Sequence, residues 1–294
     1  MKLMEEMPAR ILLDGWSILY KNLAACVLER YGRSGEAAVR GAVHLCGEKM
    51  GALERDAQAA QGRRANLLSC FAAPQVLCTD PRFHVKWQLR SEQEAVFDVL
   101  SCPIRNLLSE NGGAGVQLFF CEEYLHGCIM GYTEGTGQCC FSEDFAFPGE
   151  NSCRFSCYFR PANLPPEARP LRFGPGTPPD PPPPEPDAPA PDSRPQITRW
   201  ASLLVEAFRT ECTGRLGPGA LCAVAAGLKA AAEETSGYCR SICRLTRQRF
   251  DSGFAEESCL WDPPPCADGT LSREAAALIE INYCRTLRAA LDQC

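Results

Sequence analysis

The proline-rich stretch of residues 161–195 is the feature that most restricts how this chain folds. It includes four consecutive prolines at residues 181–184, contains no cysteine and holds few large apolar residues. Such a segment cannot bury enough apolar surface to offset the entropy lost when the chain becomes ordered. We therefore predict an extended, semi-rigid linker here, between a domain at residues 1–160 and a helical module at residues 196–294.

Composition narrows the class of protein further. The chain has 294 residues, of which 45% are hydrophobic, so a folded core is expected on both sides of the linker. The net charge of −6 argues against general nucleic-acid binding, which needs a concentrated basic surface. No apolar run reaches the roughly 18–20 residues that span a bilayer, so no membrane partner is predicted. Glu5 and Glu6 stand where a signal peptide would be apolar, which predicts a cytoplasmic protein.

Cysteine is unusually abundant, with 19 residues. In a secreted chain this number would suggest a disulfide framework, but the count is odd and the chain is long. In a reducing cytoplasm most of these cysteines are expected to be small buried apolar residues, and a few to be metal ligands or nucleophiles. An anaerobic bacterial source would keep such a cysteine load reduced most easily.

The part before the linker changes from a helical to a strand-like pattern. Apolar residues from Leu12 to Val27 recur at helical spacing and Gly32 follows, so one helix is predicted to end there and a second to span residues 34–60. Further predicted elements are strands at 73–79 and 83–89, a helix from Cys102-Pro103 to about residue 111, and a short helix at 122–131. A hairpin closes this part, with strands at 138–147 and 152–159 and a turn at 148–151.

The part after the linker has a helical pattern throughout. Helices are predicted at residues 196–213, 218–234, 236–250 and 272–292, with Pro218 and Ser272 as start signals. The predicted fold class is therefore α+β: N-terminal helices packed on an antiparallel sheet, a proline-rich linker, and then a small all-α helical module.

The first group of residues that could carry chemistry surrounds residues 121–128. Cys121, Glu123, His126 and Cys128 fall within this run, and Glu123 and His126 share a face if the run is helical. Cys102 precedes a predicted helix, whose free N–H groups would favour its thiolate form. Cys102, Cys121, Glu123 and His126 are thus the candidate catalytic residues. The alternative is a surface helix with solvated carboxylates and core cysteines.

The second group lies in the predicted hairpin. Cys153 and Cys157 point to one face of their strand, and a turn at 148–151 would place Cys140 on the same face. With Cys121 these residues are the candidate metal ligands, for zinc or an iron–sulfur cluster. The alternative is an apolar core face, which the absence of any Cys-x-x-Cys pair favours.

An ordered set of motifs resembles the L-2-amino-thiazoline-4-carboxylic acid hydrolase family. The set comprises Trp16 to Ala24 with Tyr31-Gly32, then Cys102-Pro103, Phe119-Phe120-Cys121-Glu122-Glu123, Tyr132, and Gly149-Glu150-Asn151-Ser152-Cys153-Arg154-Phe155. The resemblance covers about residues 10–160 and implies the opening of a cyclic thiazoline by water, on a route to cysteine. It implies Cys102, Cys121, Glu123 and Cys153 as site residues. Glu123 stands where the motif is expected to have an aspartate, which moves the carboxylate by one methylene.

The leading hypothesis is a hydrolase that acts on a carbon–nitrogen bond, other than a peptide bond, of a small sulfur-containing ring. Glu123 or His126 would activate water, or a thiolate of Cys102 or Cys121 would attack the ring carbon or hold a metal. His44 and His84 are interpreted as structural or solvated residues.

Two other hypotheses remain. The closing hairpin also resembles small sensor domains that hold zinc through cysteines, which suggests a non-catalytic sensor or carrier binding zinc, an iron–sulfur cluster or a small ligand. The helical module could instead serve to bind a protein partner.

Overall fold

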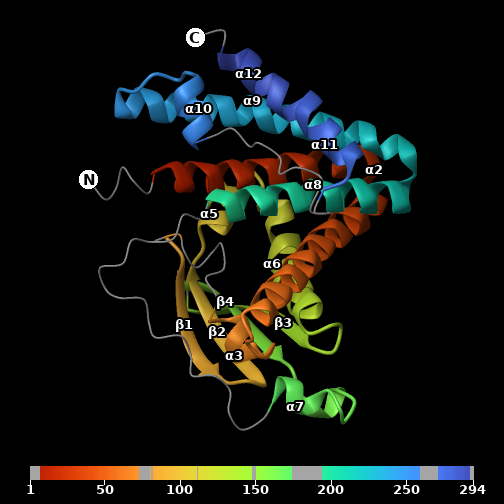
Figure 1. Cartoon of the computed structure of the whole chain (residues 1–294). Helices are drawn as coiled ribbons and strands as arrows, with labels where there is room; N and C mark the ends of the chain where they lie inside the picture. The colour runs from red at the N-terminus through yellow and green to blue at the C-terminus, as the bar shows by residue number, and fades with distance from the viewer. Residues whose placement is uncertain are drawn as a thin grey trace. The chain divides into compact units, whose positions relative to one another are not determined.

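The computed structural model describes residues 7–72, 80, 82–110, 112–147, 150–173, 194–258 and 271–291 (Figure 1). They form two compact units that are interleaved along the sequence. The first unit comprises the described residues of Met1–Val43, Ile104–Phe119 and Asp192–Cys294, and the second those of His44–Pro103 and Phe120–Pro191. Helices on both sides of the proline-rich stretch thus belong to the first unit, whereas the sequence pattern predicts one domain for all of residues 1–160.

Helix α2 (Met7–Ala60) runs through both units and changes direction at a glycine. At Gly32 φ is 52° and ψ is −128°, a conformation that favours glycine because a Cβ would be strained there. The predicted break at Gly32 and the predicted helix to residue 60 are both confirmed. By length and composition α2 is apolar enough to cross a membrane, since an 18-residue window of it reaches a mean hydropathy of 1.3, and 67% of that window is buried within the structure.

The first unit is built from helices. Besides part of α2 and the start of α6, it contains α5 (Pro103–Glu110), α8 (Arg194–Leu216), η2 (Pro218–Ala220), α9 (Leu221–Thr246), α10 (Ser252–Ser258), α11 (Arg273–Ile279), the π-helical turn η4 (Glu280–Cys284) and α12 (Arg285–Leu291). The predicted cap at Ser272 is confirmed, because its hydroxyl accepts a hydrogen bond from the Ala275 amide at 3.2 Å. The prediction of two separate helices at 218–234 and 236–250 is wrong, because α9 is one continuous helix. Ser236 lies buried inside α9, where its hydroxyl donates to the Glu233 carbonyl.

The core of the first unit joins the beginning of the chain to helices that follow the proline-rich stretch. The rings of Trp16 on α2 and Trp200 on α8 are stacked, with centroids 3.9 Å apart, and both side chains are buried. The hydroxyl of Tyr238 on α9 donates to the carboxylate of Asp14 at 2.5 Å. Residues 7–43 therefore find their packing partners in the part of the chain predicted to be a separate module.

A buried carboxylate ties α8 to the start of α11. Glu206 is 6% exposed, and it accepts hydrogen bonds from the Ser272 amide at 2.9 Å, from the Ser272 hydroxyl at 2.6 Å and from Arg209 at 2.6 Å. Burial raises the pKa of this carboxyl, but the hydrogen bonds from Arg209 and Ser272 outweigh burial and lower the pKa to about 2.

We expect the Glu206→Gln variant to lose the part of the pH dependence of stability that this carboxylate supplies. The folded-state pKa lies below the unfolded value of 4.5, so the stabilisation is fully present above pH 4.5 and is lost as the pH falls toward 2. At 1.36 kcal/mol per pKa unit this amounts to about 3 kcal/mol. Urea unfolding between pH 2 and 7 measures the difference, with the exposed Glu233→Gln on α9 as the control. Parallel pH profiles for wild type and Glu206→Gln would contradict this expectation.

The second unit contains a four-stranded antiparallel sheet in the order β1-β2-β4-β3 (Figure 1). The strands are β1 (His84–Arg90), β2 (Glu94–Ser101), β3 (Gln138–Phe147) and β4 (Glu150–Tyr158). The second unit also contains α3 (Leu67–Cys70) and the part of α6 (Ala114–Tyr132) from Phe120 onward.

Strands at 83–89, 138–147 and 152–159 were predicted and are present, so the α+β fold class is confirmed. Strand β2 was not predicted, although Ala95, Phe97 and Val99 alternate along it. Helix α6 begins eight residues before the predicted start at residue 122.

One face of the sheet carries the core of this unit. Phe97 and Phe155 contribute to it from the two central strands, and Leu67 of α3 and Tyr132 of α6 pack on them. Burial of these rings and of the apolar residues beside them is the main source of stability for the sheet, since it removes apolar surface from water.

The strand register places Cys140 on the other face. Cys139 pairs with Cys157, so Cys139 shares the core face with Cys153 and Cys157, whereas Cys140 pairs with Ser156 and is exposed. The predicted placement of Cys140 beside Cys153 and Cys157 is therefore wrong. A turn at 148–151 would have paired residue 147 with Ser152, but Asp144 is the partner of Ser152. The observed register thus differs from the predicted one by three positions. Because three is an odd number, the side chains of β3 point to the face opposite the predicted one.

The first residues of the predicted linker are ordered. Residues 161–173 include η1 (Pro161–Asn163) and α7 (Arg169–Arg172), and the ring of Phe173 lies 5.0 Å from that of Phe159. The prediction of an extended linker is wrong for residues 161–173. A few apolar side chains are enough to hold a short segment in place when they pack on an existing core. Residues 174–193 and the predicted strand at 73–79 lie outside the described residues.

Candidate functional site

Two glycine pairs bring the second half of α2 against α6. Both helices carry a Gly-x-x-x-Gly motif, formed by Gly47 and Gly51 on α2 and by Gly127 and Gly131 on α6. A Cβ on Gly127 would lie 3.0 Å from the backbone nitrogen of Glu48, and one on Gly51 would lie 2.8 Å from the carbonyl carbon of Cys128. The helices approach this closely because none of the four positions has a side chain.

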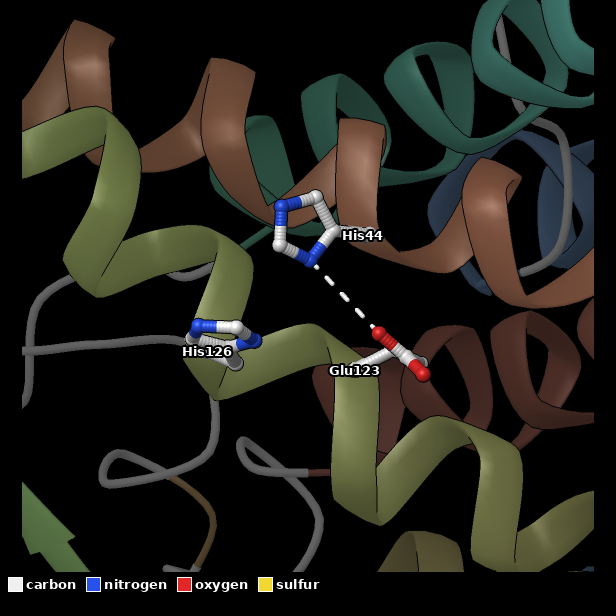
Figure 2. Close-up of side chains that lie close together, drawn as sticks. All are labelled: His44, Glu123 and His126. Carbon is white, nitrogen blue, oxygen red and sulfur yellow. Dashed lines mark ion pairs between the residues drawn. The ribbon is translucent and has the colours of Figure 1, made fainter. Parts of the chain in front are cut away.

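The side chains of His44, Glu123 and His126 meet beside this helix crossing. His44 lies three residues before Gly47 on α2, and Glu123 and His126 lie one turn apart on α6. Figure 2 shows the His44 ring projecting from α2 toward the two residues of α6. One ligand atom from each residue lies within 4.8 Å of the others. We call these three residues the His–Glu–His cluster.

The cluster combines partial burial with close approach. His44 Nδ1 lies 3.6 Å from Glu123 Oε2, and the ring centroids of His44 and His126 are 5.0 Å apart in an edge-to-face arrangement. The His44 and Glu123 side chains are 29% and 24% exposed, so solvent reaches them. Burial lowers the pKa of His126, the neighbouring His44 lowers it further, and Glu123 partly opposes both. The lowered pKa favours the neutral form of His126, which has a lone pair for a proton or a metal ion.

The structure brings together two of the four predicted catalytic residues. Glu123 and His126 belong to the cluster, whereas Cys102 lies just before α5 and packs against the core of the second unit. Cys121 is half-buried on α6, two residues before Glu123. Cys153, which the family resemblance implies as a site residue, is buried in the apolar core.

The four predicted metal ligands Cys121, Cys140, Cys153 and Cys157 do not come together. Cys140 lies on the face of the sheet opposite Cys153 and Cys157, and Cys121 lies on a helix. Within the described ranges, the His–Glu–His cluster is the group of three or more His, Cys, Asp or Glu residues whose ligand atoms all lie within 4.8 Å.

Several core cysteines of the second unit are neighbours nonetheless. The sulfur atoms of Cys139 and Cys157 are 3.4 Å apart. Burial and the nearby thiols of Cys128 and Cys139 hold the pKa of Cys70 well above its ordinary value, and burial raises the pKa of Cys128 to about 12. The Cys70 and Cys128 thiols are therefore protonated at neutral pH, as expected for cysteines that fill an apolar core. We call Cys70, Cys128, Cys139 and Cys157 the thiol cluster.

His44 is the functional candidate that sequence reasoning missed, because it was interpreted as a structural or solvated residue. The signal that identifies it is the pair of Gly-x-x-x-Gly motifs at 47–51 and 127–131, each preceded closely by a histidine. Small residues spaced four apart allow two helices to pack at short distance. Matching motifs on two helices thus indicate that the residues beside them meet.

Comparisons of the chain with known protein families, with curated proteins and with solved structures gave no match.

Proposed function

We propose that this protein hydrolyses a small cyclic substrate of the thiazoline or amidine type, and that the His–Glu–His cluster activates the attacking water. One observation carries the proposal: Glu123 and His126, the residues predicted to activate water, lie within 4.8 Å of each other and of His44. The resemblance of residues 10–160 to the L-2-amino-thiazoline-4-carboxylic acid hydrolase family supports the choice of substrate class.

The proposed reaction consumes one water molecule. The water adds across the C=N bond of the ring, its oxygen bonding to the carbon and a proton going to the ring nitrogen. Cleavage of the C–N bond then opens the ring, as the proton of the new hydroxyl leaves and a proton reaches the departing nitrogen. A carboxylate and an imidazole are suited to these transfers, because each can accept a proton from water and return it. Glu123 and His126 share one side of α6 and so act on the same water in this scheme.

We expect tag-free, reduced wild-type protein to consume L-2-amino-thiazoline-4-carboxylate, and Glu123→Gln to lower kcat by about 10²–10⁴-fold, the range for a general acid–base group. The product is followed by mass spectrometry as a gain of one water. His84→Asn is the matched control, because His84 is exposed on β1 and is the one histidine outside the cluster. A wild-type protein without turnover, with and without added divalent metal, would refute the proposed function.

Thiolate attack is an alternative route to the same product. It predicts that Cys102→Ser or Cys121→Ser abolishes turnover while Glu123→Gln retains it. The opposite pattern assigns the activated water to the cluster.

A non-catalytic sensor or carrier is the second candidate, and the gathering of Cys70, Cys128, Cys139 and Cys157 is the observation that favours it. This candidate requires thiolate ligands, whereas burial raises the pKa of Cys70 and Cys128, and the hydrogen bond with Cys139 together with burial raises the pKa of Cys157. Tightly held metal bound through sulfur, in a protein without turnover, would favour it over the hydrolase.

A further inference from the structure

We infer that the His–Glu–His cluster is a binding site for one divalent transition-metal ion, best suited to zinc, with His44, His126 and Glu123 as its protein ligands. The inference deepens the proposed function and rests on it for the chemical role of the ion. Binding of the ion is measured without turnover, so different results decide whether the metal site and the hydrolase activity exist.

The donor set fits such an ion. Two imidazole nitrogens and one carboxylate oxygen are ligands that zinc and its first-row neighbours accept readily. Three protein ligands leave one position of a tetrahedral site for water, which is the arrangement of catalytic rather than structural zinc. Glu123 and His126 form a Glu-x-x-His pair on one helix, a spacing that directs both side chains toward a facing helix in metal-binding bundles.

The separations fit as well. Two ligands at about 2.1 Å from a tetrahedral ion lie about 3.4 Å from each other. The distance of 3.6 Å between His44 Nδ1 and Glu123 Oε2 is close to this value and is too long for a hydrogen bond. The ligand atoms of all three residues lie within 4.8 Å of one another, so small side-chain rotations bring each of them to a common ion.

The backbone around the cluster is held in place by the glycine crossing. Gly127, next to His126, packs on the backbone of His44 itself, where a Cβ would lie 3.0 Å from the His44 carbonyl carbon. The two helices therefore cannot slide apart without opening this contact. Ligands fixed on packed helices lose little freedom on binding, which favours affinity.

Partial exposure leaves the ion accessible. The His44 and Glu123 side chains keep 29% and 24% of their surface exposed, so an ion can enter and a water or substrate atom can reach its open position. At that position the ion would polarise the water that the proposed function requires.

The test uses tag-free, full-length protein, kept reduced by a phosphine and freed of metal by a chelator. Titration with Co²⁺ alone is followed by absorption, because cobalt bound by nitrogen and oxygen lacks the sulfur charge-transfer band of cobalt thiolates. We expect wild type and the control His84→Asn to bind one Co²⁺ without that band, and Zn²⁺ to displace it. Single variants His44→Asn, Glu123→Gln and His126→Asn should each bind at least about tenfold more weakly.

Two results would overturn the inference. One is equal affinity of wild type and the His44→Asn/His126→Asn double variant, whose metal-free circular dichroism must match that of wild type. The other is a wild-type spectrum dominated by thiolate bands, which would place the ion on cysteines. Cobalt binding lost in the cluster variants, in a protein that never opens the thiazoline, would support the metal site and refute the hydrolase. Turnover of the thiazoline by a protein that gives either of the two overturning results would support the hydrolase and refute the metal site.

Discussion

Replacing Trp200 with alanine is expected to destabilise the first unit by about 3–5 kcal/mol, the range for removal of a large buried aromatic side chain. Trp200 is fully buried on α8, and its ring stacks on that of Trp16 at 3.9 Å. Alanine would leave a cavity and also remove the stacking contact, which contributes about 0.5–1.5 kcal/mol in aromatic pairs. A loss of this size is a large fraction of the stability of an ordinary domain.

Hydrogen exchange measured by mass spectrometry would show where the Trp200→Ala variant is weakened. Exchange should accelerate in peptides from both residues 7–43 and residues 194–246, because α2, α8 and α9 share one core. The control is Leu245→Ala, since Leu245 is 81% exposed on α9 and should change stability by less than about 0.5 kcal/mol. Acceleration confined to residues 194–246 would mean that the N-terminal helix folds without α8, as two consecutive domains would require.

Replacing Gly131 with alanine is expected to destabilise the second unit by about 1–3 kcal/mol, the usual range for overpacking. A Cβ at this position would lie 2.7 Å from the carbonyl carbon of Glu48 and 2.9 Å from its Cα. These are backbone atoms of a facing helix, so no flexible side chain can move aside. The helices must separate, and the His–Glu–His cluster should then bind Co²⁺ more weakly.

The matched control for Gly131→Ala is Gly237→Ala, which is expected to stabilise the protein rather than destabilise it. Gly237 lies in the interior of α9, is exposed, and has no atom within 4 Å of the position of a Cβ. Alanine at this position should stabilise the protein by about 0.5–1 kcal/mol, because glycine is a poor helix former. Thermal and urea unfolding of the two variants measures both effects. A stabilised Gly131→Ala variant would show that α2 and α6 do not pack closely at this point.

Much of the local structure follows from the sequence because it depends on residues a few positions apart. The kink at Gly32 follows from a backbone angle that suits glycine, and the start of α11 from the cap at Ser272. The strands at 138–147 and 152–159 were predicted from alternation and turn residues. The candidate site was half predicted, since Glu123 and His126 share a helix face through a spacing of three residues.

Tertiary structure alone decided the contacts between segments far apart in the chain. Alternation along a strand does not fix its register, and a register difference of three positions moved Cys140 away from Cys153 and Cys157. Helical periodicity marks an apolar face without naming its partner, so the stacking of Trp16 on Trp200 could not be predicted. His44 reaches Glu123 and His126 because four glycines let two helices cross closely, and a crossing depends on the packing of both surfaces at once.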